Sequence, residues 1–87
     1  MALDLPLGRA TRGFLGEIHA IAVEEGTSSL SAPEMERRLI ELGFVEGARV
    51  SILHEGLFGR DPIAVRVGGA TVALRRREAM AIRVLPL

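Results

Sequence analysis

Two histidines, His19 and His54, are the side chains of this 87-residue sequence best suited to hold a metal or transfer a proton. They have neither the i, i+4 spacing of a helical metal pair nor an HExxH pattern. Glutamates follow the histidines, at positions 24–25 and 55, and could capture a divalent ion opportunistically. A lasting site needs more ligands than these. We therefore interpret both histidines as ordinary surface or half-buried residues, and expect no metal site and no cofactor.

Other catalytic residue types are missing or lack the necessary pattern. The sequence has no cysteine and no lysine, and all eleven basic residues are arginine. This excludes a disulfide framework, a thiolate site, a P-loop lysine and Schiff-base chemistry. No serine lies in a GxSxG turn, the glycines follow neither GxGxxG nor GxxxxGK, and no spacing pairs two carboxylates for acid–base work. The sequence predicts a protein that is not an enzyme.

Binding is the remaining chemistry, and two short segments could carry it. Leu57 and Phe58 stand together between glycines, either to plug the core or to be displayed to a partner, and the sequence leaves both open. The run of arginines at 75–77 is the densest charge cluster. A solvated turn explains that run better than nucleic-acid binding, since net charge is zero and Trp and Tyr are absent. The candidate partner-binding residues are Leu57, Phe58, Arg60, Arg75, Arg76 and Arg77.

Length and composition predict one domain that spans residues 1–87. Hydrophobic residues make up 48% of the sequence, enough for one core. No apolar run approaches the roughly 20 residues of a membrane span, and the apolar lead-in Met1–Gly8 lacks the pattern of an export signal. We therefore expect a cytoplasmic domain without direct membrane insertion.

The clearest local element is a helix over Ala32–Leu42. Ser31 and Glu34 have the spacing of a capping box at its start. Gly43 suits the left-handed residue that ends a helix, and Phe44 can pack back on the last turn. One apolar stripe runs along the helix, formed by Met35, Leu39, Ile40 and Leu42.

Period-two patterns around this helix predict short strands. They cover Phe14–Val23, Ala48–His54, Ile63–Val67, Thr71–Leu74 and Ile82–Leu85. Between them we expect loops at Glu24–Leu30 and Glu55–Pro62, a tight hairpin at Gly68-Gly69 and a short helical turn at Arg75–Ala79. About five strands with one helix inserted after the first predict a mainly β fold, a small antiparallel barrel whose closure removes exposed edges.

Three segments, taken in order, resemble the FeoA family (ferrous iron transport protein A). RLIELGFVEG at 38–47, followed by RVSI at 49–52, resembles the family's RL-x-E-LG-F/M-xx-G-xx-V. LFGRDPI at 57–63 is similar to P-L/F-G-D-P-I, and VALRRREA at 72–79 resembles V-x-LR-x-x-EA. Two departures, Leu57 in place of proline and Arg60 inserted between Gly and Asp, make the loop tip longer and more apolar. The N-terminal region also departs slightly, lengthened around Arg9–Arg12.

The resemblance implies an SH3-like β-barrel and a cytosolic accessory protein that binds the cytosolic G-protein domain of the FeoB ferrous iron permease and modulates iron(II) transport. It carries over no catalytic residue, and it implies membrane association only through the transporter. Two alternatives stay open: a metal-responsive domain of the iron-dependent repressor type, and a small RNA-binding barrel. Three further questions stay open: whether the protein forms a weak homo-oligomer, whether it binds iron or another divalent metal, and whether it activates, inhibits or stabilises the transporter.

Overall fold

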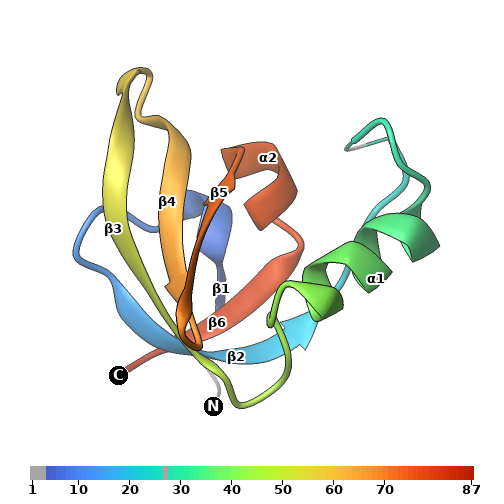
Figure 1. The fold of residues 1–87 in the computed structure, drawn as a ribbon, viewed down its shortest axis with the longest axis horizontal. Coiled ribbons are helices and arrows are strands. Elements are labelled where there is room, and N and C mark those ends of the chain that lie inside the picture. Colours follow the sequence, from blue (N-terminus) through green and yellow to red (C-terminus); the bar gives the residue numbers. More distant parts are fainter. Residues whose placement is uncertain (1–3, 27) are drawn as a thin grey trace.

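Alternating apolar residues build one antiparallel sheet in this computed structural model, which describes residues 4–26 and 28–87 (Figure 1). Its strands are β1 (Leu5–Pro6), β2 (Leu15–Ile21), β3 (Arg49–Phe58), β4 (Asp61–Val67), β5 (Ala70–Leu74) and β6 (Ile82–Pro86). They lie in the order β1-β6-β2-β3-β4-β5. Between them come the 3-10 turn η1 (Leu7–Arg9) and the helices α1 (Ala32–Glu41) and α2 (Arg76–Ala79). The start of the apolar lead-in, residues 1–3, lies outside the described residues.

The mainly β, SH3-like fold class is confirmed, with two differences of detail. The sheet has six strands, because Leu5 and Pro6 pair with Val84 and Arg83 at its edge. The helix therefore follows the second strand. Hydrogen bonds do not close the sheet into the expected barrel, since β1 and β5 are its two edges. The sheet is therefore open between β1 and β5. The segments η1 and α2, which follow these edge strands, pack against each other across that gap.

The predicted loop at Glu55–Pro62 is wrong, because β3 and β4 continue through most of it as a long hairpin. Phe58 pairs with Asp61, leaving only Gly59 and Arg60 in the turn. These two residues have φ of 70° and 59°, as the type I′ turn that suits a two-residue hairpin requires. Gly56 lies at a register shift, where a Cβ atom would come within 2.1 Å of the Asp61 carbonyl oxygen. Only glycine permits that approach.

The helix α1 is confirmed, with its start and end formed as expected. The Ser31 hydroxyl accepts a hydrogen bond from the Glu34 N–H and donates one to the Glu34 carboxylate. Gly43 has φ of 106°, and the Phe44 N–H donates to the Leu39 carbonyl at 3.0 Å, which completes a Schellman ending. The hairpin at Gly68-Gly69 and the turn at α2 are also confirmed.

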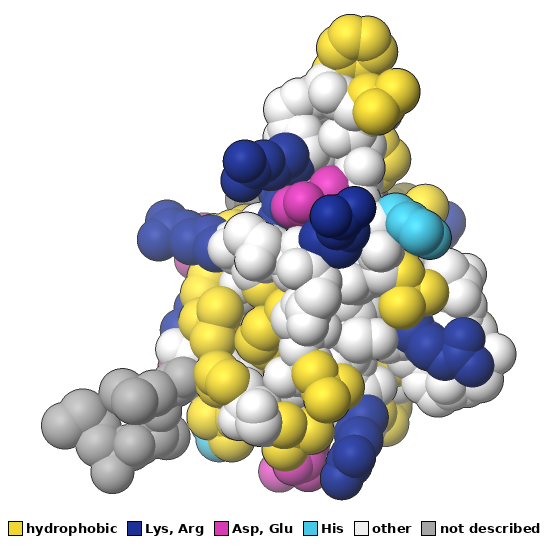
Figure 2. Space-filling view, turned by 90° about the vertical axis from the view of Figure 1, so that its left-hand side faces the viewer, with side chains coloured by type: hydrophobic (Ala, Val, Ile, Leu, Met, Phe, Trp, Pro, Cys, Tyr) yellow, Lys and Arg dark blue, Asp and Glu magenta, His cyan; other side chains and the backbone are white. Residues whose placement is uncertain are grey.

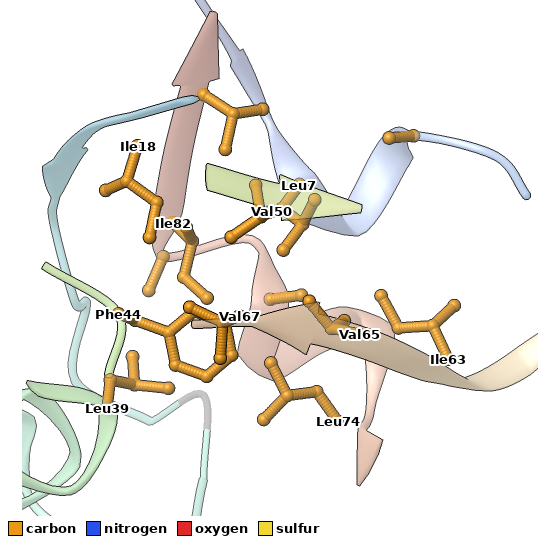
Figure 3. Close-up of a cluster of buried hydrophobic side chains, with 14 of the residues drawn as sticks. Leu7, Ile18, Leu39, Phe44, Val50, Ile63, Val65, Val67, Leu74 and Ile82 are labelled. Atoms are coloured by element: carbon orange, nitrogen blue, oxygen red, sulfur yellow. The ribbon is translucent and has the colours of Figure 1, made fainter. Parts of the chain in front are cut away.

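One hydrophobic core joins the helix to the sheet. Leu39 from α1 and Phe44 from the segment after it are fully buried and belong to the same cluster as side chains from β2, β4 and β6 (Figure 3). The labelled strand residues of that cluster include Ile18, Val67 and Ile82. This core fixes α1 against the sheet, and leaves the far end of the β3–β4 hairpin beyond the packed layer (Figure 1).

None of the helices in the described part of the chain has the length and apolar composition that crossing a bilayer demands.

Candidate functional site

The β3–β4 hairpin projects from the sheet and carries apolar side chains at its end (Figures 1 and 2). We call residues 57–60 the hairpin tip. Leu57 is 94% exposed and Phe58 is 90% exposed, so this pair is displayed and does not plug the core. No residue of β3 after Ile52 is fully buried, because the strand extends beyond the core. The structure thus decides what the sequence left open about these two residues.

Arg76 connects the part of this hairpin next to the tip to the rest of the molecule. Its Nη2 atom lies 2.6 Å from Oε2 of Glu55 on β3, and its Nε–H donates to the Arg60 carbonyl at 2.9 Å. Its backbone N–H donates to the Asp61 carboxylate, also at 2.9 Å. The side chains of Arg76 and Glu55 are 20% and 18% exposed, so solvent screens their ion pair only partly. The hairpin is therefore held at both of its strands.

The same guanidinium also bonds to the N-terminal segment, across the gap between the edge strands β1 and β5. Its Nη1–H groups donate to the carbonyls of Gly8 and Ala10, at 3.0 and 2.6 Å, in and just after η1. Gly8 itself lies against α2, where a Cβ atom would come within 2.2 Å of the Arg76 carbonyl oxygen. One arginine thus connects the N-terminal segment, the hairpin and α2.

The three arginines of the predicted site therefore have different environments. Arg76 is half-buried and bonded within the molecule, whereas Arg75 and Arg77 are exposed on either side of it. Arg60 is exposed in the hairpin turn, and only its carbonyl is engaged by Arg76. The structure brings Arg60 and Arg76 together below Leu57 and Phe58. The sequence reasoning missed Glu55 and Asp61 as partners of Arg76, and no local spacing points to these contacts.

The histidines are exposed and lie on different strands, with His19 on β2 and His54 on β3. Across residues 4–26 and 28–87, no three side chains of His, Cys, Asp or Glu gather in a group that could hold a metal ion.

At the β1 edge, the Arg83 guanidinium hydrogen-bonds to the Asp4 carboxylate, with Nη2 and Oδ1 3.0 Å apart. This hydrogen bond, helped by the positive charge of Arg83, holds the pKa of Asp4 below its ordinary value. Because the folded pKa is lowered, the contact stabilises the fold above the ordinary carboxyl pKa. That contribution is lost as pH falls through the lowered value.

We expect Arg83→Gln to raise the titration midpoint of the Asp4 carboxyl toward that of a free aspartate. The carboxylate would lose its charged partner while the edge strand keeps its backbone bonds to β6. An NMR pH titration of the Asp4 carboxyl carbon measures this midpoint. A midpoint that is equal in the variant and the parent would contradict the assigned cause.

Comparison with known proteins places this geometry in a family. The family model described as FeoA domain matches residues 5–86. A FeoA protein from Chlorobium tepidum, with a solution structure, is 34% identical, with a TM-score of 0.78 over 95% of this chain and 70% of its own. FeoA from Stenotrophomonas maltophilia, complexed with zinc and described as an SH3 domain protein, is 29% identical, with a TM-score of 0.72 over 95% and 89%.

A second kind of protein shares the fold. A manganese-dependent transcriptional repressor is 26% identical and has a TM-score of 0.78 over 100% of this chain, which spans 44% of the repressor's length. The comparison with curated protein sequences returned no match. Since the family match covers the sheet, α1 and the hairpin together, this chain belongs to the FeoA domain family.

Proposed function

We propose that this chain is a cytoplasmic accessory protein of ferrous iron uptake that binds the cytosolic domain of the FeoB permease and modulates iron(II) transport. Membership of the FeoA domain family supports the link to ferrous iron transport. The observation that carries the proposed contact is the display of Leu57 and Phe58 on the hairpin tip. Monomeric proteins seldom hold two large apolar side chains almost fully in water without a partner for them.

The hairpin tip has the properties of a binding anchor. Burying a Leu or Phe side chain contributes about 1.5–3 kcal/mol each, which makes the pair the strongest apolar anchor on this hairpin. The two-residue turn and the bonds from Arg76 to both strands hold the tip in place before binding. A preorganised tip loses little conformational freedom on association. Arg60 adds an exposed positive charge beside the apolar pair.

We expect the double variant Leu57→Ala/Phe58→Ala to weaken binding to the permease's cytosolic domain at least about 30-fold, because it removes most of the apolar area of the hairpin tip. Its melting temperature should stay close to that of the parent, since neither side chain packs in the core. Calorimetric titration with the isolated cytosolic domain, with and without guanine nucleotide, measures both the affinity and its dependence on nucleotide.

The matched control is Ile40→Ala/Val45→Ala, which trims two other exposed apolar side chains, on and just after α1. This control should bind like the parent. Equal binding by the hairpin variant and the parent would exclude the hairpin tip as the contact. Absence of binding by the parent itself would overturn the proposed function.

The repressor similarity supports a second candidate, a metal-responsive regulatory domain. That function predicts tight, stoichiometric binding of Mn²⁺ or Fe²⁺ in solution, which the accessory function does not require. The RNA-binding alternative loses support, because one of the three arginines it needs, Arg76, is engaged within the fold.

A further inference from the structure

A groove of about 300 Å³ lies between α2 on one side and α1 with the segment before it on the other. Its polar lining comes from both sides, with Ser28, Ser29 and Arg38 on one side and Arg75, Arg77 and Glu78 on the other. We call it the arginine groove. It shares no residue with the hairpin tip, which carries the proposed permease contact, but it includes Arg75 and Arg77 of the predicted partner-binding residues.

The arginine groove carries concentrated positive charge. Three guanidinium groups and one carboxylate give it a formal charge of +2, in a chain whose net charge is zero. The carboxylate of Glu78 already accepts the backbone N–H of Arg75 at 2.9 Å. Among the described residues, Arg38, Arg75 and Arg77 form no ion pair, whereas Arg76 and Arg83 do. An anion bound among these guanidinium groups would reduce their mutual repulsion.

The elements that carry the donors of the groove are held in place by contacts with the rest of the molecule. Arg76 is tied into the molecule between Arg75 and Arg77, and this fixes the short helix that presents them. Across the groove, Arg38 lies one turn after Met35, which is buried in the core and secures α1. The Ser28 hydroxyl accepts the Leu30 N–H at 3.0 Å and shapes the segment that carries Ser29. The groove is therefore lined from two elements whose positions the core determines.

We propose that the arginine groove binds a phosphate dianion, either as a free phosphate compound or as the phosphomonoester headgroup of a lipid. Guanidinium groups bind phosphate oxygens through paired, charge-assisted hydrogen bonds, and serine hydroxyls donate to the same oxygens. The charge of the groove matches that of a dianion. Its volume admits one or two phosphate groups and excludes a large ligand from full burial.

The first arm titrates the full chain with inorganic phosphate and then pyrophosphate, at constant ionic strength, and follows amide shifts by NMR. The variant Arg38→Gln/Arg77→Gln removes one guanidinium from each side of the groove and leaves Arg75, whose backbone N–H bonds to Glu78 at the start of α2, unchanged. The control Arg49→Gln/Arg66→Gln removes the same charge from two exposed arginines on β3 and β4. We expect the groove variant to bind at least about tenfold more weakly, and the control to bind like the parent.

The second arm measures co-sedimentation with phosphatidylcholine vesicles that contain phosphatidic acid, for the same three proteins. If the parent and the control bind phosphate or pyrophosphate and only the groove variant loses this binding, the result supports a free phosphate ligand. Binding confined to the phosphatidic acid vesicles, and lost in the same variant, supports the lipid headgroup. The proposal is overturned if the parent binds neither, or if the groove variant and the control lose binding equally.

Discussion

Replacing Arg76 with methionine should lower the free energy of unfolding by about 2–4 kcal/mol, a large fraction of the stability of a domain this small. The change removes the guanidinium bonds to Gly8, Ala10, Glu55 and Arg60, but leaves the backbone bond to Asp61 in place. It strands the half-buried carboxylate of Glu55 and the carbonyls of Gly8 and Ala10, two buried residues. Urea unfolding followed by circular dichroism measures the loss.

The neighbouring arginines provide the control for this experiment. Arg75→Met and Arg77→Met make the same chemical change at exposed positions, where no side-chain hydrogen bond to another described residue is lost. Each should change stability by less than about 0.5 kcal/mol. If all three variants proved equally stable, Arg76 would not connect the segments as described. Glu55→Gln, which keeps the shape but loses the charge, should show an intermediate effect.

Leu39→Ala should cost about 2–5 kcal/mol, because it opens a cavity beneath α1. The side chain is fully buried and belongs to the same cluster as Phe44 and the inner faces of the strands. Ile40→Ala, one residue further along the same helix, is the control: Ile40 is 46% exposed, and alanine favours helix there. Thermal unfolding of the two variants compares the loss of a buried side chain with the loss of an exposed one. Similar melting temperatures for both would mean that α1 does not pack through Leu39.

The helix was predictable because its signals are local. The cap at Ser31, the apolar stripe and the glycine after the last turn all lie within a few residues of the bonds they make. The strands were predictable for the same reason, from alternation along a short stretch. The family resemblance rested on such segments in a fixed order, and the FeoA domain match bears it out.

The features that sequence reasoning missed depend on distant contacts. The edge strand β1 exists because Leu5 meets Val84, almost eighty residues later, and Pro6 made the segment look irregular. The extension of β3 and β4 into the expected loop depends on pairing between the two strands. The glycines at 56 and 59 made this segment look like a loop in the sequence. Three consecutive arginines look alike in sequence, and only the tertiary structure turns the middle one inward.

The pairing of β1 with β6 brings the first and last described strands together at one sheet edge, with Leu5 beside Val84. Figure 1 shows the start of β1 and the end of β6 on the side of the molecule opposite the hairpin tip. When the first and last strands of a domain lie side by side, the domain can be linked to another protein through either strand. It can also be inserted between two other domains without strain. A surface immobilisation tag or a fluorescent fusion joined beyond either strand would thus leave the apolar tip facing solvent.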